Sequence, residues 1–413
     1  MNPVTEETAA ARPPVPDLSD PLLHQRGEAG PVLARLRREE PVCEVRRADG
    51  STFWAVLSYE LITQVLADAG TFSSTGGMRL DADPVATAAA TGKMMVITDP
   101  PLHGMIRRVV SSAFTPRMVL RLEETMRTIS VEVIEAALGQ DSVDFTEVAA
   151  RLPLSVICDM LGVPRADWDF MLSRTMTAFG VGGDHGPEQE QRVATAHTDL
   201  FLYYDELMRL RRKEPQEDII SALVHGRIDG RPLTEEEIIL NCNGLISGGN
   251  ETTRHATIGG LLALIEHPEQ WRRLQEEPEV LPTAVQEILR WTTPAMHVLR
   301  TATRDTELAG RRIRAGDMVA LWLASGNRDE TVFEDPERFD IGRREVNRNL
   351  TFAYGSHFCI GSALATTELN TFFDVLRQRV ARAEPTGEVR RMRSNLIGGI
   401  EHLPVRLVPR DRA

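Results

Sequence analysis

The spacing of apolar residues along the chain predicts a protein built mostly of helices. Apolar positions recur every three to four residues over long stretches, which is the period of an amphipathic helix. Shorter runs rich in branched and aromatic residues, bounded by turn formers, are typical of strands. The expected helices cover about 32–38, 59–68, 117–138, 148–163, 166–179, 187–213 and 234–266, and the expected strands cover 42–45, 53–57, 307–308, 312–313 and 318–323. The pattern therefore predicts a mainly α fold with a small β region.

The longest expected helix has a strong start and an unusual middle. Thr234 and Glu237 form a capping box, and the apolar period continues to Glu266. At 1.5 Å per residue, such a helix is about 48 Å long and would cross the whole molecule. Its middle contains Gly248 and Gly249, each of which costs about 1 kcal/mol relative to alanine in a helix. We expect a functional reason to offset that cost.

The same helix carries a stripe of residues on one face. Leu245, Gly248, Gly249 and Thr252 lie at i, i+3, i+4 and i+7. The small residues of the stripe allow a flat ligand to lie against the backbone, and Glu251 places an acid next to the Thr252 alcohol. Taken alone, the pattern also fits a kinked core helix with a satisfied polar pair.

The segment around Cys359 offers a candidate metal ligand. Gly355 and Gly361 bracket the cysteine, and a helical pattern begins at Ser362. A cysteine just before a helix lies among free backbone N–H groups, which favour the thiolate. A thiolate in this position is a metal ligand or a nucleophile. A buried, inert cysteine is the alternative.

Two further segments carry charged pairs at helical spacing. His103 and Arg107 follow a pair of prolines and stand on one helical face, where Arg107 can bind a carboxylate through two nitrogens. Glu287 and Arg290 lie one turn apart. Alone, the first pair also fits an exposed basic turn, and the second fits a surface ion pair worth less than about 1 kcal/mol.

In combination, these segments resemble the cytochrome P450 superfamily. Phe352, Gly355, Cys359 and Gly361 match the pattern Phe-x-x-Gly-x-x-x-Cys-x-Gly of the haem-binding loop. The oxygen-binding groove and the Glu-x-x-Arg pair of that family follow in the expected order. The resemblance covers essentially all of residues 30–410.

The resemblance also implies an architecture. It implies the cytochrome P450 fold, a triangular single-domain helical bundle around haem with a small β region. We expect this haem-thiolate domain over residues 21–413, after a loosely held arm over residues 1–20. A structural triad of Glu287, Arg290 and Arg338 is implied near the cysteine loop.

On the cofactor side, the resemblance implies that Cys359 is the proximal ligand of the iron of haem b. His103, Arg107, Arg300 and His357 would hold the haem propionates. The cofactor-binding residues expected on this basis are His103, Arg107, Arg300, Phe352, Gly355, His357, Cys359 and Gly361.

On the opposite side, the resemblance implies that the long helix forms the oxygen groove. Gly248 and Gly249 would make room for dioxygen, the co-substrate. Glu251 and Thr252 would deliver the protons that splitting the O–O bond requires. Arg254 is close enough to restrain Glu251 electrostatically.

The expected substrate pocket is mostly apolar, which favours a medium-sized hydrophobic substrate. His297 is its odd polar member, and a structural role for this histidine is the alternative. A glycine-rich loop over residues 179–187 can act as the hinge of a lid, and a plain surface connection is the alternative. The pocket residues expected by resemblance are Leu245, Ala295, Met296, His297, Val298 and Ile397.

The activity implied by the resemblance is monooxygenation, in which one atom of dioxygen enters the substrate. We expect a tailoring hydroxylase or epoxidase of secondary metabolism, with a substrate that is free or bound to a carrier protein. A sterol or fatty-acid hydroxylase and an oxidative C–C or C–N coupling enzyme are alternatives. A haem-free recruitment module would lose the cysteine or the groove, a peroxide-driven enzyme would lack the acid–alcohol pair, and a haem sensor would need no proton relay.

Electrons are expected from NAD(P)H through a separate ferredoxin or flavodoxin. The chain has 413 residues and four cysteines, which leaves no room for a reductase module or an iron–sulfur cluster. A basic face near the thiolate would receive this partner, despite the acidic character of the whole chain. The residues of that face are Arg107, Arg108, Arg117 and Arg344.

Charge and composition exclude several other classes. The formal net charge of −13 argues against nucleic acid as a partner. No apolar run approaches the roughly 18 residues of a membrane span, and the acidic N-terminus does not read as a signal peptide. The four cysteines are far apart, which indicates no disulfide framework. We therefore expect a soluble cytoplasmic monomer.

Overall fold

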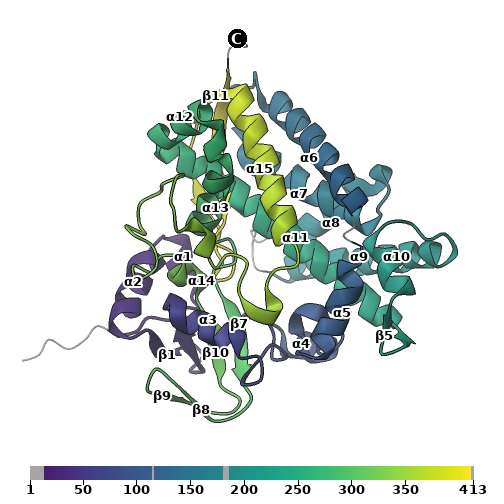
Figure 1. The fold of residues 1–413 in the computed structure, drawn as a ribbon, viewed down its shortest axis with the longest axis vertical. Coiled ribbons are helices and arrows are strands. Elements are labelled where there is room, and N and C mark those ends of the chain that lie inside the picture. Colours follow the sequence, from purple (N-terminus) through teal and green to yellow (C-terminus); the bar gives the residue numbers. More distant parts are fainter. Residues whose placement is uncertain (1–13, 114–115, 180–185, 411–413) are drawn as a thin grey trace, which may run out of the picture.

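Helices make up most of the described chain, and the largest sheet lies at the lower left of Figure 1. The computed structural model describes residues 14–113, 116–179 and 186–410. Its helices are α1 (Pro21–Gln25), α2 (Ala29–Glu39), α3 (Tyr59–Ala67), α4 (Pro84–Ala90), α5 (Leu102–Ser111), α6 (Pro116–Ala137), α7 (Phe145–Leu161), α8 (Trp168–Phe179), α9 (Pro187–Lys213), α10 (Ile219–His225), α11 (Glu235–Glu266), α12 (Pro268–Glu276), α13 (Leu281–Thr292), α14 (Leu323–Gly326) and α15 (Ser362–Arg379). Its strands are β1 (Val42–Arg46), β2 (Thr52–Val56), β3 (Phe72–Ser73), β4 (Val143–Asp144), β5 (Arg227–Ile228), β6 (Arg231–Pro232), β7 (Val298–Ala302), β8 (Thr306–Leu308), β9 (Arg311–Ile313), β10 (Met318–Leu321), β11 (Val380–Pro385), β12 (Arg390–Arg391), β13 (Ile400–His402) and β14 (Pro404–Pro409).

This arrangement confirms the expected mainly α fold with a small β region, and its outline is roughly triangular (Figure 1). None of the described helices is long and apolar enough to cross a membrane. The predicted hinge loop lies largely outside the described residues, since 180–185 are not among them.

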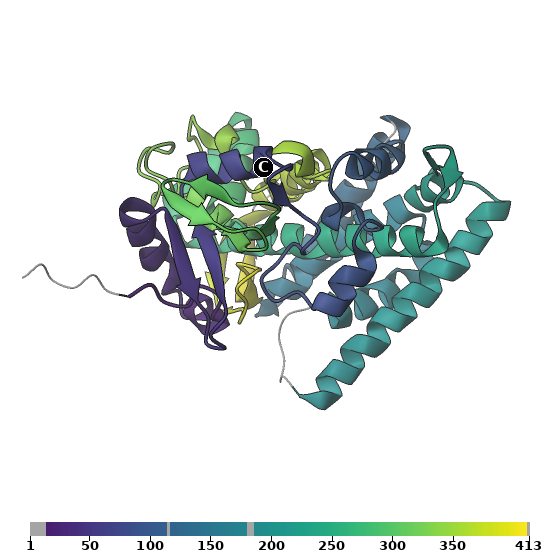
Figure 2. The ribbon, with the colours of Figure 1, turned by 90° about the horizontal axis from the view of Figure 1, so that it is seen from below.

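Helix α11 is the central element of the structure and crosses the middle of the molecule (Figure 2). The predicted capping box is present: the Glu237 N–H donates to Thr234 Oγ1 at 3.2 Å, and the Thr234 N–H donates to the Glu237 carboxylate at 2.7 Å. Helices α7, α13 and α15 pack against α11, and their apolar faces form the largest core cluster. Such burial at about 25 cal/mol per Å² is what stabilises so long a helix.

A five-stranded sheet forms the main β region, in the order β1-β2-β10-β7-β3. Strands β1 and β2 form an antiparallel hairpin with Val45 opposite Phe53, and β2 pairs with β10 in parallel. The chain enters β7 shortly after α13 ends, so residues 293–297 connect the helical core to the sheet. The C-terminal strands return against α11, where β13 contacts that helix.

The N-terminal segment corrects one expectation. Residues 1–13 lie outside the described residues, but Leu18 and Ser19 are buried. Asn395 Nδ2 donates to the carbonyl oxygen of Ser19 at 2.7 Å, and Arg47 Nε donates to Ser19 Oγ at 3.1 Å. The expectation of a loosely held arm up to residue 20 is therefore wrong at Leu18 and Ser19, because these contacts hold the segment.

The structural triad also differs from its prediction. Glu287 and Arg290 are fully buried, and two nitrogens of Arg290 each donate to the Glu287 carboxylate at 2.7 Å. The second arginine is Arg343, whose Nε lies 3.2 Å from both carboxylate oxygens. Arg338 is exposed, and only its carbonyl oxygen takes part, accepting from Arg343 Nη2 at 2.7 Å. The assignment of Arg338 to the triad is wrong, because the loop turns its side chain outward.

Candidate active site

A cavity of about 290 Å³ lies between the middle of α11 and the cysteine loop. Helix α5, the segment before β7 and the start of α15 complete its walls. The structure therefore brings segments that are far apart in sequence to a single site. Of the residues predicted for the site, those that line this cavity are His103, Arg107, Leu245, Gly248, Gly249, Thr252, Ala295, Val298, Phe352, His357, Cys359 and Gly361.

Two glycines shape the cysteine loop. Gly355 has a φ of 74°, and a side chain there would lie 2.5 Å from the carbonyl oxygen of Leu66, so only glycine fits. The N–H of Cys359 donates to the carbonyl oxygen of Phe352 at 3.0 Å, which closes the loop. A Cβ at Gly361 would lie 3.9 Å from Cys359 Sγ, an ordinary van der Waals contact, so Gly361 lies directly beside the sulfur.

Cys359 borders the cavity and is exposed to it, although protein atoms surround the sulfur closely on its other sides. Burial raises the pKa of the thiol, while the N–H of Gly361 and the charge of Arg107 lower it. The backbone N–H at the start of the helix therefore lowers the pKa of the thiol, as predicted, but burial has the larger effect and raises it. A metal cation itself deprotonates a thiol that coordinates it, so a metal ligand is the role that this environment fits.

Basic side chains gather at one edge of the cavity. His103 and Arg107 come from α5, and His357 belongs to the 3₁₀ turn Gly355–His357. The rings of His103 and His357 lie 4.1 Å apart between centroids. Burial lowers the pKa of both histidines, that of His357 to about 3, and neighbouring cations act in the same direction. The histidines are therefore neutral, and the positive charge of this edge comes from arginines.

Arg300 is a buried cation that lacks a full negative partner. Its Nη1 donates to the carbonyl oxygen of Leu299 at 2.8 Å. Burial lowers the pKa of Arg300 to about 10, and the charge of Asp99 offsets this only in part. The propionate carboxylates of haem would supply the missing negative charge. With an accessible cysteine sulfur on one wall and glycines on the other, the residues present fit haem.

The predicted stripe of α11 faces the cavity. A Cβ added to Gly248 would meet nothing within 4 Å, whereas one added to Gly249 would touch Ile157 of α7. Thr252 Oγ1 donates to the carbonyl oxygen of Gly248 at 2.8 Å. Since this bond uses the hydroxyl hydrogen, the oxygen lone pairs of Thr252 stay available to a group in the cavity.

Glu251 does not line the cavity. Consecutive helical residues point about 100° apart, so a cavity-facing Thr252 leaves Glu251 on the flank of α11. Its carboxylate accepts from Asn250 Nδ2 at 3.1 Å and lies 3.5 Å from Arg254 Nη1 and 3.3 Å from His255 Nε2. Burial alone would raise the pKa of Glu251, but His255 and Arg254 bring it below its ordinary value. The predicted restraint by Arg254 is confirmed, and the expected place of Glu251 beside the flat ligand is wrong.

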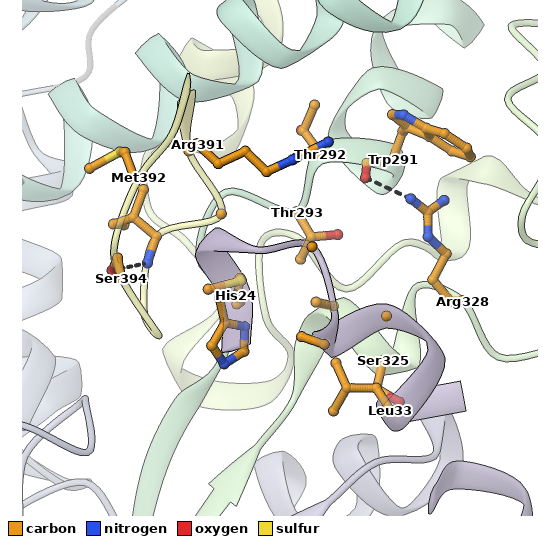
Figure 3. A pocket seen from close by; sticks show the side chains of 18 of the residues that line it. His24, Leu33, Trp291, Thr292, Thr293, Ser325, Arg328, Arg391, Met392 and Ser394 are labelled. Atoms are coloured by element: carbon orange, nitrogen blue, oxygen red, sulfur yellow. Dashed lines mark hydrogen bonds between the residues drawn. The ribbon is translucent and has the colours of Figure 1, made fainter. Parts of the chain in front are cut away.

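The predicted pocket residues divide between two cavities. Leu245, Ala295 and Val298 line the cavity at the cysteine. Met296 and Ile397 line a second cavity of about 270 Å³, between α2, the end of α13 and the C-terminal hairpin of residues 390–402 (Figure 3). Met296 follows Ala295 in an extended segment, so its side chain points to the other side. Ile397 belongs to the hairpin that covers this segment. The assignment of Met296 and Ile397 to the substrate pocket is wrong.

His297 is a structural residue and not a pocket residue. It is fully buried, its Nδ1 lies 3.1 Å from the carbonyl oxygen of Asn395, and its Nε2 accepts from the N–H of Leu80 at 3.3 Å. Burial lowers its pKa to about 4, so the ring is neutral. His297 ties the C-terminal hairpin to the loop before α4, which corrects its assignment to the substrate pocket.

Several cavity residues were not identified from sequence. Asn241 of α11 accepts from the N–H of Met95 at 2.9 Å and donates to the carbonyl oxygen of Lys93 at 2.8 Å, which fixes that segment over the cavity. This contact belongs to the stretch 72–98, whose sequence gives no sign of which side chains point inward. The methionines that line the cavity are Met78, Met94, Met95 and Met160.

Glu368 of α15 is a second residue that sequence reasoning missed. It lines the cavity and is 3% exposed, and its Oε2 has no hydrogen-bond partner among the described residues. Burial raises the pKa of Glu368 well above its ordinary value, so the group is a neutral acid. No local pattern distinguishes this glutamate from the exposed ones, because only the packing of α15 buries it.

A thiol ligand facing a glycine stripe, with buried cations at the edge of the cavity, defines the class of haem-thiolate proteins. The cytochrome P450 family model matches residues 186–381. Cytochrome P450 NovI of Streptomyces niveus is 38% identical over 95% of this chain and 96% of its own length. Linalool 8-monooxygenase of Pseudomonas putida is 36% identical over 96% of this chain and 99% of its own length. The crystal structure of P450 OxyD, involved in the biosynthesis of vancomycin-type antibiotics, superposes with a TM-score of 0.87 at 35% identity, over 95% of this chain and all of that one.

The chain belongs to the cytochrome P450 family and is a P450 monooxygenase. Haem iron, dioxygen and an external electron donor follow from the family.

Proposed function

We propose that the protein is a tailoring hydroxylase or epoxidase that acts on a medium-sized hydrophobic substrate in secondary-metabolite biosynthesis. The observation that carries this proposal is the cavity lining, which is apolar and rich in methionine away from its basic edge. Methionine is flexible and adapts to irregular apolar ligands. The likeness to OxyD, which is involved in the biosynthesis of vancomycin-type antibiotics, supports a role in secondary metabolism.

The proposed cofactor is haem b. Cys359 would hold its iron, and Arg107 and Arg300 with His103 and His357 would hold its propionates. Bound haem supplies the activation of dioxygen, with electrons that come from NAD(P)H through a separate ferredoxin or flavodoxin. The protein holds the cofactor, excludes bulk water and positions the substrate against the face toward α11.

Thr252 and Glu251 are the proposed proton-handling pair. The Thr252 oxygen faces the cavity and can accept a hydrogen bond there, while Glu251 is held as an anion on the flank of α11. A carboxylate accepts a proton from water and returns it to a neighbouring acceptor. We propose that Thr252 holds the proton donor in place at the cavity and that Glu251 supplies the proton by rotating toward it.

Replacing Thr252 with valine is expected to lower product formation about 10²-fold and to release hydrogen peroxide in its place. Valine keeps the shape of threonine but cannot hold a proton donor at the cavity. The measurement is product and peroxide formed per NAD(P)H consumed. Thr257→Val is the matched control, because Thr257 makes the same bond to the carbonyl oxygen four residues earlier, at 2.9 Å, in the buried part of α11. Equal effects of the two substitutions would refute the proposed role of Thr252.

The electron donor is proposed to dock at the face around the cysteine loop. Arg108 and Arg344 are exposed, as are the rings of Tyr354 and Phe358 in the cysteine loop, whereas Arg107 lines the cavity. The side chain of Arg117 lies outside the described residues.

Arg108→Glu is expected to slow reduction by an acidic ferredoxin about tenfold at low salt, measured by stopped-flow spectroscopy. The same charge reversal at Arg209 of α9 should leave the rate unchanged, and an unchanged rate for Arg108→Glu would contradict the docking site.

The test of the proposed function is a visible-spectrum titration of the ferric holoprotein with defined ligand classes. The panel contains free polyketides, aromatic amino-acid derivatives, sterols, fatty acids and carrier-protein-bound acyl groups. A ligand that displaces water from the iron shifts the haem band toward high spin. A shift with natural-product scaffolds, free or carrier-bound, would support the proposal. A shift with sterols or fatty acids alone would favour a lipid hydroxylase, and products with new C–C or C–N bonds would favour oxidative coupling.

A further inference from the structure

We propose that His255 is a positioning residue that ties Glu251 to the C-terminal hairpin, so that the wall of the substrate pocket and the acid of the oxygen groove are mechanically linked. The hairpin is the segment 390–402, which includes β12 and β13. This inference rests on the proposed proton role of Glu251.

His255 faces Glu251 from one turn further along α11. Both side chains are buried, and His255 Nε2 lies 3.3 Å from Glu251 Oε2, slightly longer than an ordinary hydrogen bond. Neither of these two atoms has a hydrogen-bond partner of good geometry among the described residues, so the 3.3 Å approach is a close electrostatic contact between two otherwise unpaired buried groups. The remaining charged neighbour is Arg254, which lies 3.5 Å from the other carboxylate oxygen and donates to the carbonyl oxygen of Thr146. The imidazole is therefore the neighbouring group that Glu251 Oε2 faces most closely at this end of the carboxylate.

The backbone of the hairpin sets the tautomer of His255. The N–H of Ile400 points at His255 Nδ1 at 3.4 Å. A backbone N–H can only donate, so Nδ1 must be the acceptor, and in the neutral ring the hydrogen then sits on Nε2. That hydrogen lies on the side of the ring next to the Glu251 carboxylate, 3.3 Å from Nε2 to Oε2. His255 is thus a fixed donor to Glu251, and its orientation depends on β13.

Gly399 allows the hairpin to approach this closely. A Cβ at Gly399 would lie 2.8 Å from His255 Nδ1, so a side chain there would displace the ring. On the other side, the N–H of Gly398 donates to the carbonyl oxygen of Pro294 at 2.8 Å, and Ile397 forms a β-bridge with Ala295. Ala295 lines the cavity at the cysteine. Consecutive backbone contacts therefore connect the pocket wall to His255.

The second cavity gives this hairpin room to move. Gly398, Gly399 and Met392 border it, and Figure 3 shows Arg391 of the hairpin reaching across that space toward Thr292. An element bordered by a cavity is not fixed by close packing on that side. A ligand pressing on Ala295 can thus displace the hairpin, and with it the donor that restrains Glu251.

The experiment compares His255→Leu, His255→Gln and His267→Gln in the holoprotein without substrate, with a surrogate ferredoxin, ferredoxin reductase and NADPH. Leucine removes the donor, and glutamine retains an N–H near the place of Nε2. His267 follows the same helix and lies 3.8 Å from a carboxylate of Glu269, far along α11 from the site. In His255→Leu, Glu251 loses the donor that restrains it and is freer to rotate toward Thr252. Substrate-free NADPH oxidation should therefore rise about tenfold, and its solvent isotope effect should fall. The two glutamine variants should stay close to the parent protein.

A second measurement detects the link without turnover. Nitrogen NMR of histidine-labelled protein in the ferrous carbon-monoxide form should show the hydrogen on Nε2 of His255. Ala295→Leu, which fills the pocket wall, should shift the His255 signals and leave those of His267 unchanged.

Either of two results would overturn the inference: a hydrogen on Nδ1 of His255, or an unchanged oxidation rate in His255→Leu at equal haem content. The variant Glu251→Gln distinguishes failure of this inference from failure of the proposed proton relay through Glu251 and Thr252. If Glu251→Gln slows turnover while His255→Leu has no effect, the relay stands and the inference falls. If Glu251→Gln has no effect, the relay falls, and the inference falls with it.

Discussion

Replacing Cys359 with serine is expected to abolish monooxygenase activity while the fold remains. Cys359 is the cysteine whose sulfur borders the cavity, and the other three cysteines are buried elsewhere. A serine hydroxyl does not supply the electron density that a thiolate gives to haem iron, so turnover should fall by several orders of magnitude. The measurements are the carbon-monoxide difference spectrum of the reduced protein, which should lose the thiolate-ligated band, and NADPH-driven product formation.

Cys43→Ala is the matched control for this substitution. Cys43 is buried in β1, and burial raises the pKa of its thiol to about 12, so it is an inert packing residue. Its truncation should cost about 1 kcal/mol of stability and leave the spectrum and the activity unchanged. A Cys359→Ser protein that kept the thiolate band would contradict the assignment of the proximal ligand.

The elements that sequence predicted well are those set by local signals. The start of α11 is fixed by the Thr234–Glu237 capping box, and both partners lie within four residues of each other. The cysteine loop likewise depends on its own glycines, since Gly355 occupies a conformation that a side chain would block. Backbone requirements of this kind depend on a few neighbouring residues, so they can be predicted from sequence without knowledge of the packing.

The side toward which a residue points was the least predictable property. Ala295 and Met296 are neighbours, yet one faces the cavity at the cysteine and the other faces the second cavity. His297 binds the carbonyl oxygen of Asn395, a partner almost 100 residues away. The facing of these residues is set by the C-terminal hairpin, whose position depends on contacts distant in sequence.

The burial of ionisable side chains was equally hard to predict from sequence. Glu368 lies on α15 in a sequence that also suits an exposed helix, and its burial follows only from the packing of that helix against the cavity. The orientation of Glu251 is a related case, because its partner His255 gave no signal apart from helical spacing. Electrostatic roles of this kind depend on desolvation, which is a property of the fold.

Replacing Arg343 with alanine is expected to destabilise the protein by about 3 kcal/mol or more. Arg343 is 6% exposed, shares the fully buried Glu287 with Arg290, and donates to the carbonyl oxygens of Asp335 and Arg338. Its loss leaves a buried carboxylate with one partner fewer and removes two hydrogen bonds to carbonyl oxygens, each of which keeps one other donor. Urea unfolding followed by circular dichroism measures the change, and haem content should fall as well, because this network supports the segment leading to the cysteine loop.

Arg338→Ala decides between the two assignments of the triad. The exposed Arg338 contributes its carbonyl oxygen, which alanine also has, so the substitution should change stability by no more than about 0.5 kcal/mol. Both variants remove one arginine charge, so the comparison separates the buried network from a general effect of net charge. A large loss in Arg338→Ala with a small one in Arg343→Ala would restore the assignment made from sequence, and the reverse result would show that Glu287 is neutralised by Arg290 and Arg343 together.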